Sequence, residues 1–460
     1  MAGEYFYERE RALLGSRFDA LLTPAADQAA RGVTVNTLRC TTQRFAAGCG
    51  LPLRPSPFCP ASYFVDLPDF HPGRHPYHHA GAFYSQEPSA AAPAALLDVQ
   101  PGMKVLDTCA APGGKSSQLA AALQGQGLLV CNEYEAGRAS ILRGNLERMG
   151  VSNAVVTNED TARLAEAFPA FFDRVLVDAP CSGEGMFRKE PQALTQHSEA
   201  LVRQCAALGA QILENAARML APGGLLVYST CTFAPEEDEG QVAAFLARHP
   251  DFALESCGEA FGSPGEENRT GGLPLDVSKV RRIWPSQGGE GHFMARLRRL
   301  DGPETAPVRP AKSAPICKEW SVFAKEYFLE LADRPAVLRG DKLFLLPAVP
   351  MPAAAQKLRI LRAGVLAGTV RKGRFEPEHH LFTAFGTLCK NQLNLPLADE
   401  RVQAYLQGHP IPAPEAGNGW CAVLVDGYPL GGAKVSSQTA KNHYPKGLRL
   451  LGAVEIGSGL

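Results

Sequence analysis

The chain has 460 residues, and at about 100 to 200 residues per domain this length predicts two to four domains and excludes a single small one. Hydrophobic residues make up 45% and charged residues 20% of it, which excludes wholesale disorder and a fibrous protein. Lysines and arginines number 46 against 47 acidic residues, so the overall charge does not indicate a nucleic-acid partner. From Asp301 onward, however, the chain carries 19 basic and 14 acidic residues, so its C-terminal third is the basic part.

Cysteine usage and the N-terminus indicate a soluble, cytoplasmic protein. The 12 cysteines are spread singly from Cys40 to Cys421 with no CxxC pair, which argues against a disulfide framework and a structural zinc site. The first ten residues carry several charges and do not resemble a signal peptide. No stretch approaches the roughly 18 uninterrupted apolar residues that cross a bilayer. We therefore expect no metal, no membrane partner and a monomeric protein.

The N-terminal region predicts a small separate unit. Residues 8–22 alternate charged and apolar side chains at helical spacing, and residues 33–38 are typical of a short β-branched strand. A long stretch punctuated by proline and glycine follows over residues 51–76.

After Pro88, a series of short apolar runs predicts an α/β domain. Each run precedes a segment of helical character, which indicates a doubly wound, mostly parallel sheet that binds ligands beyond the carboxyl ends of its strands. A last strand is expected over residues 292–297, so the sheet should be complete near Leu300. The earlier runs are residues 105–106, 128–130, 154–156, 175–177 and 225–227.

The region beyond Leu300 predicts a linker and then a β-rich module. Residues 302–315 hold five prolines or glycines among few apolar residues, as linkers do. Residues 337–346, 361–370 and 420–435 are typical of strands joined by glycine turns. One or two mixed or all-β C-terminal domains are therefore expected.

A glycine turn after the first predicted strand is the first candidate for a binding site. The run from Val105 to Ser116 is a strand, a glycine turn and a helix that begins near Lys115. It is not a Walker A loop, because Cys109 stands where that pattern needs glycine, and it lacks GxGxxG. S-adenosylmethionine requires only a tight turn with amide donors, so it fits this run. Glu133, nineteen residues after Gly114, is a candidate acceptor for its ribose hydroxyls.

Further polar residues end the later strands. Asp160 follows the third strand and is either an acceptor for the adenine amino group or a surface acid in a loop. Asp178 and Cys181 follow the fourth strand, and Cys231 follows the fifth. A lone cysteine is usually a core residue. Two thiols beside small polar residues, at the ends of adjacent strands, point instead to function.

At these positions the sequence resembles the Sun (Fmu) family of S-adenosylmethionine-dependent RNA cytosine-5 methyltransferases. Its core motifs match in AAPGGK over residues 110–115, DAPCSG over 178–183 and STCT over 229–232. Further matches are RGVTVNTL over 31–38, FYSQEP over 83–88 and RIWP over 282–285, although Ser286 and Gln287 stand where members often have histidine. DGYPLG over 426–431 and KNHYPKG over 441–447 are similar to the PUA-like end of the ribosomal small-subunit methyltransferase F branch.

The resemblance implies a fold and a set of domains. It implies a Rossmann-like class I methyltransferase core at residues 86–300, preceded by an N-terminal RNA-binding unit at 1–85. A first C-terminal domain at 316–375 and a PUA-like RNA-binding domain at 376–460 follow. The implied partner is RNA, most plausibly 16S ribosomal RNA or the small ribosomal subunit.

The resemblance also implies residue roles. Cys231 is the nucleophile, Cys181 assists product release and a protonated Asp178 stabilises the activated ring, although a Pro-Cys pair such as the one at Cys181 also marks the nucleophile of DNA cytosine-5 methyltransferases. Residues implied to bind the cofactor are Cys109, Ala110, Ala111, Pro112, Gly113, Gly114, Lys115, Glu133, Arg138, Asp160 and Asp178. Residues implied to bind RNA are Lys189, Lys441, His443 and Lys446, although a solvated surface explains them about as well without the resemblance.

The implied chemistry suits these residue types. Carbon 5 of cytosine is a weak nucleophile, so its methylation needs a transient thiolate adduct at carbon 6. The target base must leave its stack, which favours single-stranded RNA, with Phe187 or Phe233 available for stacking. Alternatives are the same chemistry on tRNA, a P-loop-like nucleotide hydrolase, and a non-catalytic RNA-binding protein on a methyltransferase fold.

Overall fold

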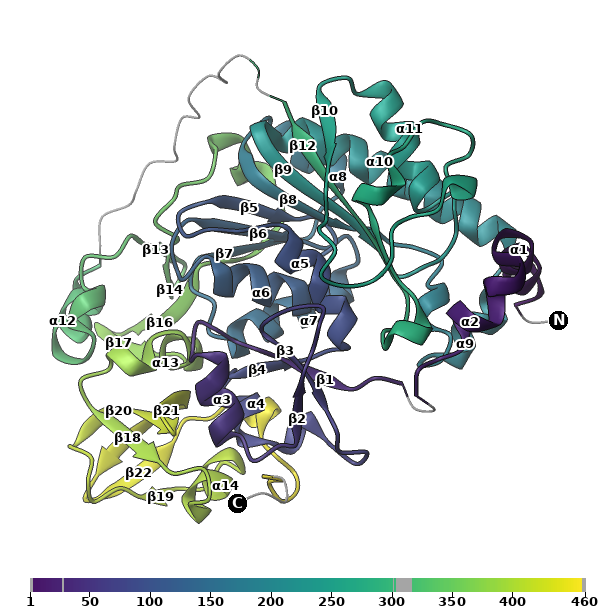
Figure 1. Ribbon diagram of the computed structural model, residues 1–460. Helices are drawn as coiled ribbons and strands as arrows, with labels where there is room; N and C mark the ends of the chain where they lie inside the picture. The colour runs from purple at the N-terminus through teal and green to yellow at the C-terminus, as the bar shows by residue number, and fades with distance from the viewer. Residues whose placement is uncertain (1–2, 27–28, 301, 303–316, 457–460) are drawn as a thin grey trace.

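The computed structural model describes residues 3–26, 29–300, 302 and 317–456 (Figure 1). Its first part is a small antiparallel sheet with flanking helices, which confirms the predicted helical segment and strand. The sheet has the order β2-β3-β1-β4, and β1 is buried along its whole length. The elements are α1 (Glu4–Leu14), α2 (Phe18–Leu22), β1 (Gly32–Val35), α3 (Thr42–Gly48), β2 (Leu53–Pro55), β3 (Ser62–Val65), α4 (Pro76–His79) and β4 (Phe83–Ser85).

The central part is the predicted doubly wound domain. Its strands form a nine-stranded sheet of order β10-β12-β9-β8-β5-β6-β7-β15, with β11 paired to β12. The five strands from β9 to β7 are parallel to one another. At one edge β12 pairs antiparallel with β9, and β10 pairs antiparallel with β12. The strands are β5 (Lys104–Asp107), β6 (Leu128–Asn132), β7 (Ala154–Thr157), β8 (Phe172–Asp178), β9 (Leu220–Thr230), β10 (Phe252–Glu255), β11 (Arg281–Ile283) and β12 (His292–Arg299).

Helices cover both faces of this sheet, and successive residues of one strand enter different cores. Leu106 packs in a core with residues of α8, α10 and α11, whereas its neighbour Val105 packs with residues of α5, α6 and α7. This alternation is the two-residue period of a strand buried on both faces. The helices are α5 (Ala92–Leu96), α6 (Gly114–Ala122), α7 (Ala136–Arg148), α8 (Thr161–Ala167), α9 (Pro191–Gln196), α10 (Glu199–Met219) and α11 (Glu239–Arg248).

The prediction that the sheet is complete near Leu300 is wrong. β15 (Ile360–Ala363) belongs to the C-terminal third and pairs antiparallel with β7, so it closes the far edge of the central sheet. Arg362 of this strand is buried, and its guanidinium donates to the carbonyls of Gly364, at 2.6 Å, and Val151. The sequence pattern could not show this, because a strand's partner across a long chain separation leaves no local signal.

The C-terminal third contains two further sheets and is mixed α/β. The predicted linker lies outside the described residues apart from Gly302. Helix α12 (Lys318–Tyr327) precedes a sheet of order β13-β14-β16-β17, and a second sheet has the order β18-β20-β21-β22-β19. The elements are β13 (Ala336–Arg339), β14 (Lys342–Leu345), β16 (Val365–Arg371), β17 (Arg374–Pro377), α13 (His379–Phe385), β18 (Gln392–Leu395), α14 (Glu400–Leu406), β19 (Ile411–Pro412), β20 (Gly419–Val425), β21 (Tyr428–Ser436) and β22 (Thr439–Asn442).

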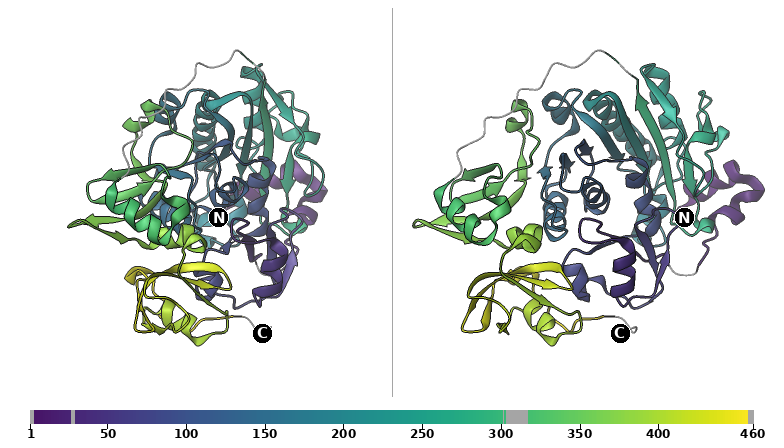
Figure 2. Two further views of the ribbon diagram at one scale, coloured as in Figure 1. Left: turned by 90° about the vertical axis from the view of Figure 1, so that its left-hand side faces the viewer. Right: turned by 60° about the vertical axis from the view of Figure 1, so that its left-hand side comes forward.

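The first and last sheets of the chain share one hydrophobic core. Val33 and Phe45 of the N-terminal unit pack in the same cluster as Leu393 and Val423 of the last sheet. Figure 2 shows the C-terminal sheets along one side of the central domain, with α1 and α2 at its opposite end.

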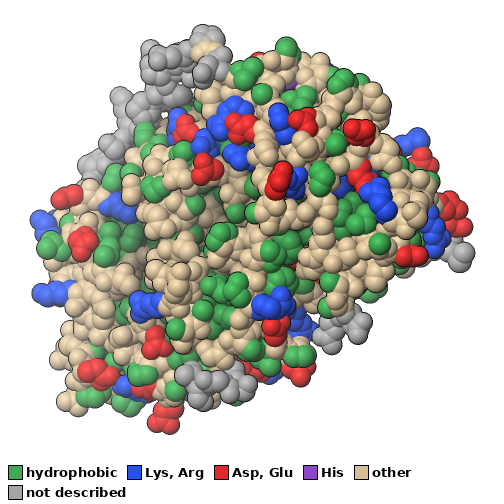
Figure 3. All heavy atoms as spheres, viewed as in Figure 1, with side chains coloured by type: hydrophobic (Ala, Val, Ile, Leu, Met, Phe, Trp, Pro, Cys, Tyr) green, Lys and Arg blue, Asp and Glu red, His purple; other side chains and the backbone are tan. Residues whose placement is uncertain are grey.

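The surface has no dominant charge of one sign on the face shown in Figure 3, where basic and acidic side chains are intermixed. Among the described residues, no helix has the length and apolar character to cross a bilayer.

We predict that Arg362→Ala destabilises the central domain. The substitution leaves the buried carbonyl of Val151 without this donor, and an unpaired buried polar group costs about 1 to 3 kcal/mol. Thermal unfolding should show a lower melting temperature. The control is Arg371→Ala, at an exposed position of β16, and its melting temperature should be close to that of wild type. Equal decreases in the melting temperature of the two variants would contradict the role assigned to β15.

Candidate active site

The glycine turn leads from β5 into α6 at the carboxyl edge of the central sheet. Gly113 precedes α6 with a φ of 116°, a conformation that favours glycine. No side chain among the described residues caps the first turn of α6, so its N–H groups are available to a bound anion. Cys109 lies two residues after the end of β5, and burial raises the pKa of its thiol, so this cysteine stays a neutral lining group.

The predicted cofactor carboxylate Glu133 lies at the end of β6. It is 4% exposed, and its Oε1 accepts from the backbone N–H of Glu135 at 3.0 Å. Its Oε2 faces the Arg138 guanidinium at 3.7 Å, and Arg138 also donates to the carbonyl of Ala111 at 2.9 Å. A carboxylate oxygen with only this loose partner suits ribose hydroxyl donors, so the residues present fit the predicted cofactor.

Asp160 is placed differently from Glu133. It is exposed and caps α8, where its Oδ1 accepts from the N–H of Ala162 at 2.7 Å. This is the ordinary work of an aspartate at a helix start. The neighbouring Glu159 is buried and bonds instead to Arg163 and to the N–H of Arg359, next to β15.

Asp178 at the end of β8 is held by two donors. The Lys115 ammonium donates to its Oδ2 at 2.7 Å, and the Ser229 hydroxyl donates to its Oδ1 at 2.7 Å. Burial opposes the charge on Lys115, but the Asp178 carboxylate outweighs it and raises the pKa of Lys115. In this arrangement both Asp178 oxygens accept hydrogen bonds, whereas the resemblance implies that Asp178 is a donor during catalysis.

The structure brings the two predicted thiols into contact. The sulfurs of Cys181 and Cys231 are 3.3 Å apart, and the N–H of Cys231 points to the Cys181 sulfur at 3.4 Å. The hydrogen bond to Cys231, together with burial, raises the pKa of Cys181 well above its usual value. Cys181 therefore keeps its proton at neutral pH.

Two buried glutamates that the sequence analysis did not identify fix the loops that carry the thiols. Glu237 accepts from the hydroxyl and the N–H of Ser182, at 2.6 and 2.9 Å, and burial raises its pKa to about 7. Glu184 accepts from the N–H of Phe233 at 3.0 Å. Each bond joins the loop after β8 to the loop after β9, which are separated by about fifty residues of chain, so only the fold reveals them.

The RNA-facing candidates are only partly gathered here. Lys189 is half-buried, and burial lowers its pKa against the opposing charges of Glu87 and Glu290. Phe233, predicted as a possible stacking residue, is buried and already stacks on Trp284, with ring centroids 5.4 Å apart. Lys441, His443 and Lys446 are exposed in the last sheet and the turn after it.

Family models match four consecutive parts of the chain. Residues 94–298 match the 16S rRNA methyltransferase RsmB/F model, and residues 3–88 match the N-terminal domain of 16S rRNA methyltransferase RsmF. Residues 322–385 match the RsmF first C-terminal domain, and residues 392–450 match the methyltransferase RsmF PUA domain.

Relatives and solved structures agree with these models. The ribosomal RNA small subunit methyltransferases F of Cronobacter sakazakii and Shewanella amazonensis are 32% and 33% identical to this chain, covering 96% and 90% of it and 94% and 91% of their own lengths. A methyltransferase homologue from Pyrococcus horikoshii is 29% identical with a TM-score of 0.57, covering 64% of this chain and 95% of its own. NSun6 from Pyrococcus horikoshii, at 22% identity and a TM-score of 0.55 over 65% of this chain and 98% of its own, shares the fold.

Together with the contact between the two thiols at the strand ends, these likenesses confirm the predicted resemblance: the chain belongs to the ribosomal RNA small subunit methyltransferase F family and is an S-adenosylmethionine-dependent RNA methyltransferase.

Proposed function

We propose that the protein methylates carbon 5 of cytosine in 16S ribosomal RNA through a covalent adduct with Cys231. The observation that carries this proposal is the 3.3 Å contact between a protonated Cys181 and Cys231, beside the Lys115–Asp178 ion pair. A thiolate is the nucleophile that cytosine-5 methylation requires. The family names refer to ribosomal RNA, which favours it over tRNA as the substrate.

The cofactor site is proposed at the carboxyl ends of β5 and β6. The backbone of residues 109–115 would hold the amino acid part of S-adenosylmethionine, and Glu133 would accept from its ribose hydroxyls while Arg138 supports the turn. Asp160 keeps one carboxylate oxygen beyond its capping bond and would accept from the adenine amino group. When bound, the cofactor supplies the methyl group.

Cys231 begins the chemistry as a thiolate. The sulfur adds to carbon 6 of the ring, and the displaced electron pair moves toward nitrogen 3. Carbon 5 then has the electron density of an enamine and can accept a methyl group.

The ring nitrogen needs a proton donor at this stage. Asp178 can donate only when protonated, and Lys115 and Ser229 now occupy its oxygens as donors. We infer that RNA binding changes this pairing, so that Asp178 carries a proton toward nitrogen 3. The group is then positioned where negative charge develops.

Cys181 is suited to the closing steps. Adduct formation turns Cys231 into an uncharged thioether, which removes the hydrogen bond that raises the pKa of Cys181. Cys181 then releases its proton to solvent more readily and can accept the proton from carbon 5. The electron pair of that C–H bond restores the ring double bond, Cys231 leaves as a thiolate, and nitrogen 3 returns its proton to Asp178.

RNA binding is proposed at both ends of the chain as well as at the site. Residues 1–85 and 376–460 are the two units expected to bind RNA, and they share one core. Lys434 and Lys441 lie opposite each other on neighbouring strands, and both are exposed. Together with His443 and Lys446 they form a basic surface that can contact phosphates.

We predict that Glu133→Ala weakens cofactor binding. Ribose hydroxyls left without this acceptor cost about 1 to 3 kcal/mol, or roughly fivefold to more than a hundredfold in Kd. Titration calorimetry with S-adenosylhomocysteine measures the loss. The same substitution at exposed Glu166 is the control, and an unchanged Kd for Glu133→Ala would remove Glu133 from the site.

We predict opposite effects for the two thiols. With 16S ribosomal RNA, Cys181→Ser should leave enzyme and RNA joined on a denaturing gel, because attack and transfer proceed but elimination slows. Cys231→Ser and the double variant should give no joined band, since a hydroxyl cannot replace a thiolate as the attacking group. Cys205→Ser, a half-buried thiol of α10, should behave as wild type. A joined band from Cys231→Ser and none from Cys181→Ser would reverse the roles.

We predict that Lys441→Gln combined with Lys446→Gln weakens RNA binding without affecting cofactor binding. Each lost phosphate contact should reduce the slope of log K against log salt concentration by roughly 0.7 to 0.9. Filter binding of 16S ribosomal RNA at several salt concentrations measures both quantities. Lys357→Gln, at another exposed position, is the control. An unchanged slope in the double variant would show that Lys441 and Lys446 do not contact phosphates.

A further inference from the structure

The loop that follows Cys231 is held through the backbone of Phe233. The N–H of Phe233 donates to Glu184 at 3.0 Å, and its carbonyl accepts from Arg269 at 2.8 Å. Phe233 stands two residues after the nucleophile, and the carbonyl of Cys231 itself accepts from Gly185 at 2.9 Å. Two charged side chains therefore determine the course of the chain immediately after the nucleophile.

Glu184 and Arg269 each have an oppositely charged partner on α1. Arg9 donates to Glu184 at 2.7 Å, and Glu10 accepts from Arg269 at 2.6 Å. The side chains of Glu184, Glu10 and Arg269 are 0% exposed, and that of Arg9 is 10% exposed. Removing one member of a buried ion pair leaves an uncompensated charge in the interior. Buried ion pairs, as well as apolar packing, therefore connect α1 to the two side chains that hold the loop after Cys231.

Glu184 and Arg269 each have a further partner outside α1. His197 bonds to the second oxygen of Glu184 at 2.8 Å, and Glu266 bonds to Arg269 at 2.9 Å. Burial alone would raise the pKa of Glu184, but His197 and Arg9 lower it to about 2, so it is a fixed anion at working pH. Phe6 of α1 lies against Phe233, with ring centroids 6.0 Å apart.

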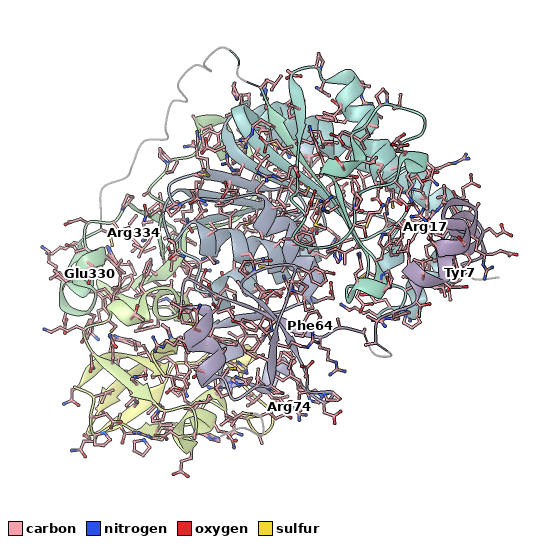
Figure 4. The ribbon with its side chains drawn as sticks, viewed as in Figure 1. Tyr7, Arg17, Phe64, Arg74, Glu330 and Arg334 are labelled. Atoms are coloured by element: carbon pink, nitrogen blue, oxygen red, sulfur yellow. The ribbon has the colours of Figure 1, made fainter. Side chains whose placement is uncertain are left out.

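We propose that α1 is a positioning element for the nucleophile: Arg9 and Glu10 hold Glu184 and Arg269 on the backbone of Phe233 and so orient the Cys231 sulfur. This inference rests on the proposed role of Cys231. Figure 4 labels Tyr7 and Arg17, which mark this N-terminal segment at the end of the central domain opposite Glu330 and Arg334. A helix more than two hundred residues away in the sequence thereby acts on the geometry of the nucleophile.

The test compares Arg9→Gln with Arg11→Gln, a change at an exposed position of the same helix. Two rates are measured: alkylation of Cys231 by iodoacetamide, followed by peptide mass spectrometry, and adduct formation with 16S ribosomal RNA containing 5-fluorocytidine, whose fluorine blocks release. We expect Arg9→Gln to slow adduct formation at least tenfold and to change the alkylation rate of Cys231. The Kd for S-adenosylhomocysteine and the KM for RNA should stay near wild type.

Arg9→Lys keeps the positive charge but not the forked geometry, and it should slow adduct formation severalfold. If Arg9→Gln no longer binds S-adenosylhomocysteine, we treat it as misfolded, and the two rates are then compared between Arg9→Lys and Arg11→Gln. Wild-type adduct and alkylation rates in whichever variant binds cofactor normally would overturn the proposal. The proposed function fails differently, because wild-type enzyme would then form no adduct or Cys231→Ser would still form one.

Discussion

The pairing register of β8 with β9 determines where the chemistry can occur. Asp178 stands opposite Ser229 in this parallel pair, so the two strands leave the sheet side by side, with Cys181 three residues after Asp178 and Cys231 two residues after Ser229. Because side chains alternate between the two faces of a sheet, a slip of one residue would turn one partner to the opposite face. The 2.7 Å bond from Ser229 to Asp178 and the 3.3 Å sulfur contact both depend on this register.

A correct register brings the thiols close but does not orient them, and the loops provide the orientation. Glu237 and Glu184 each tie the loop after β8 to the loop after β9, and both are buried. Buried carboxylates are costly unless they are paired. Glu184 is paired with Arg9 and His197. Glu237 instead accepts hydrogen bonds from the hydroxyl and the amide of Ser182, and burial raises its pKa to about 7. The same fold therefore keeps one carboxyl permanently charged and lets the other take up a proton.

What the sequence could predict follows from how local each signal is. The strands around Val105 and Val175, the turn at Gly113 and the two thiols are marked by apolar runs and by residues directly after them, so they were predictable. The pairing of β15 with β7, the bond from Lys115 to Asp178 and the contacts of Arg9 join residues far apart in the chain, where no pattern in either segment refers to the other. The burial of Phe233 against Trp284 was missed for the same reason.

These long-range contacts connect the proposed RNA-binding parts to the catalytic ones. The first sheet shares its core with the last, and β15 joins the C-terminal third to the edge of the central sheet. Helix α1 is ion-paired to Glu184 and Arg269, which bond to the backbone of Phe233 in the loop after Cys231. The tyrosine hydroxyl of Tyr77 also donates to Asp426 across the first of these junctions, at 2.8 Å. Because protein interiors are closely packed and transmit displacement, these contacts fix the position of the proposed RNA-binding parts relative to the candidate active site.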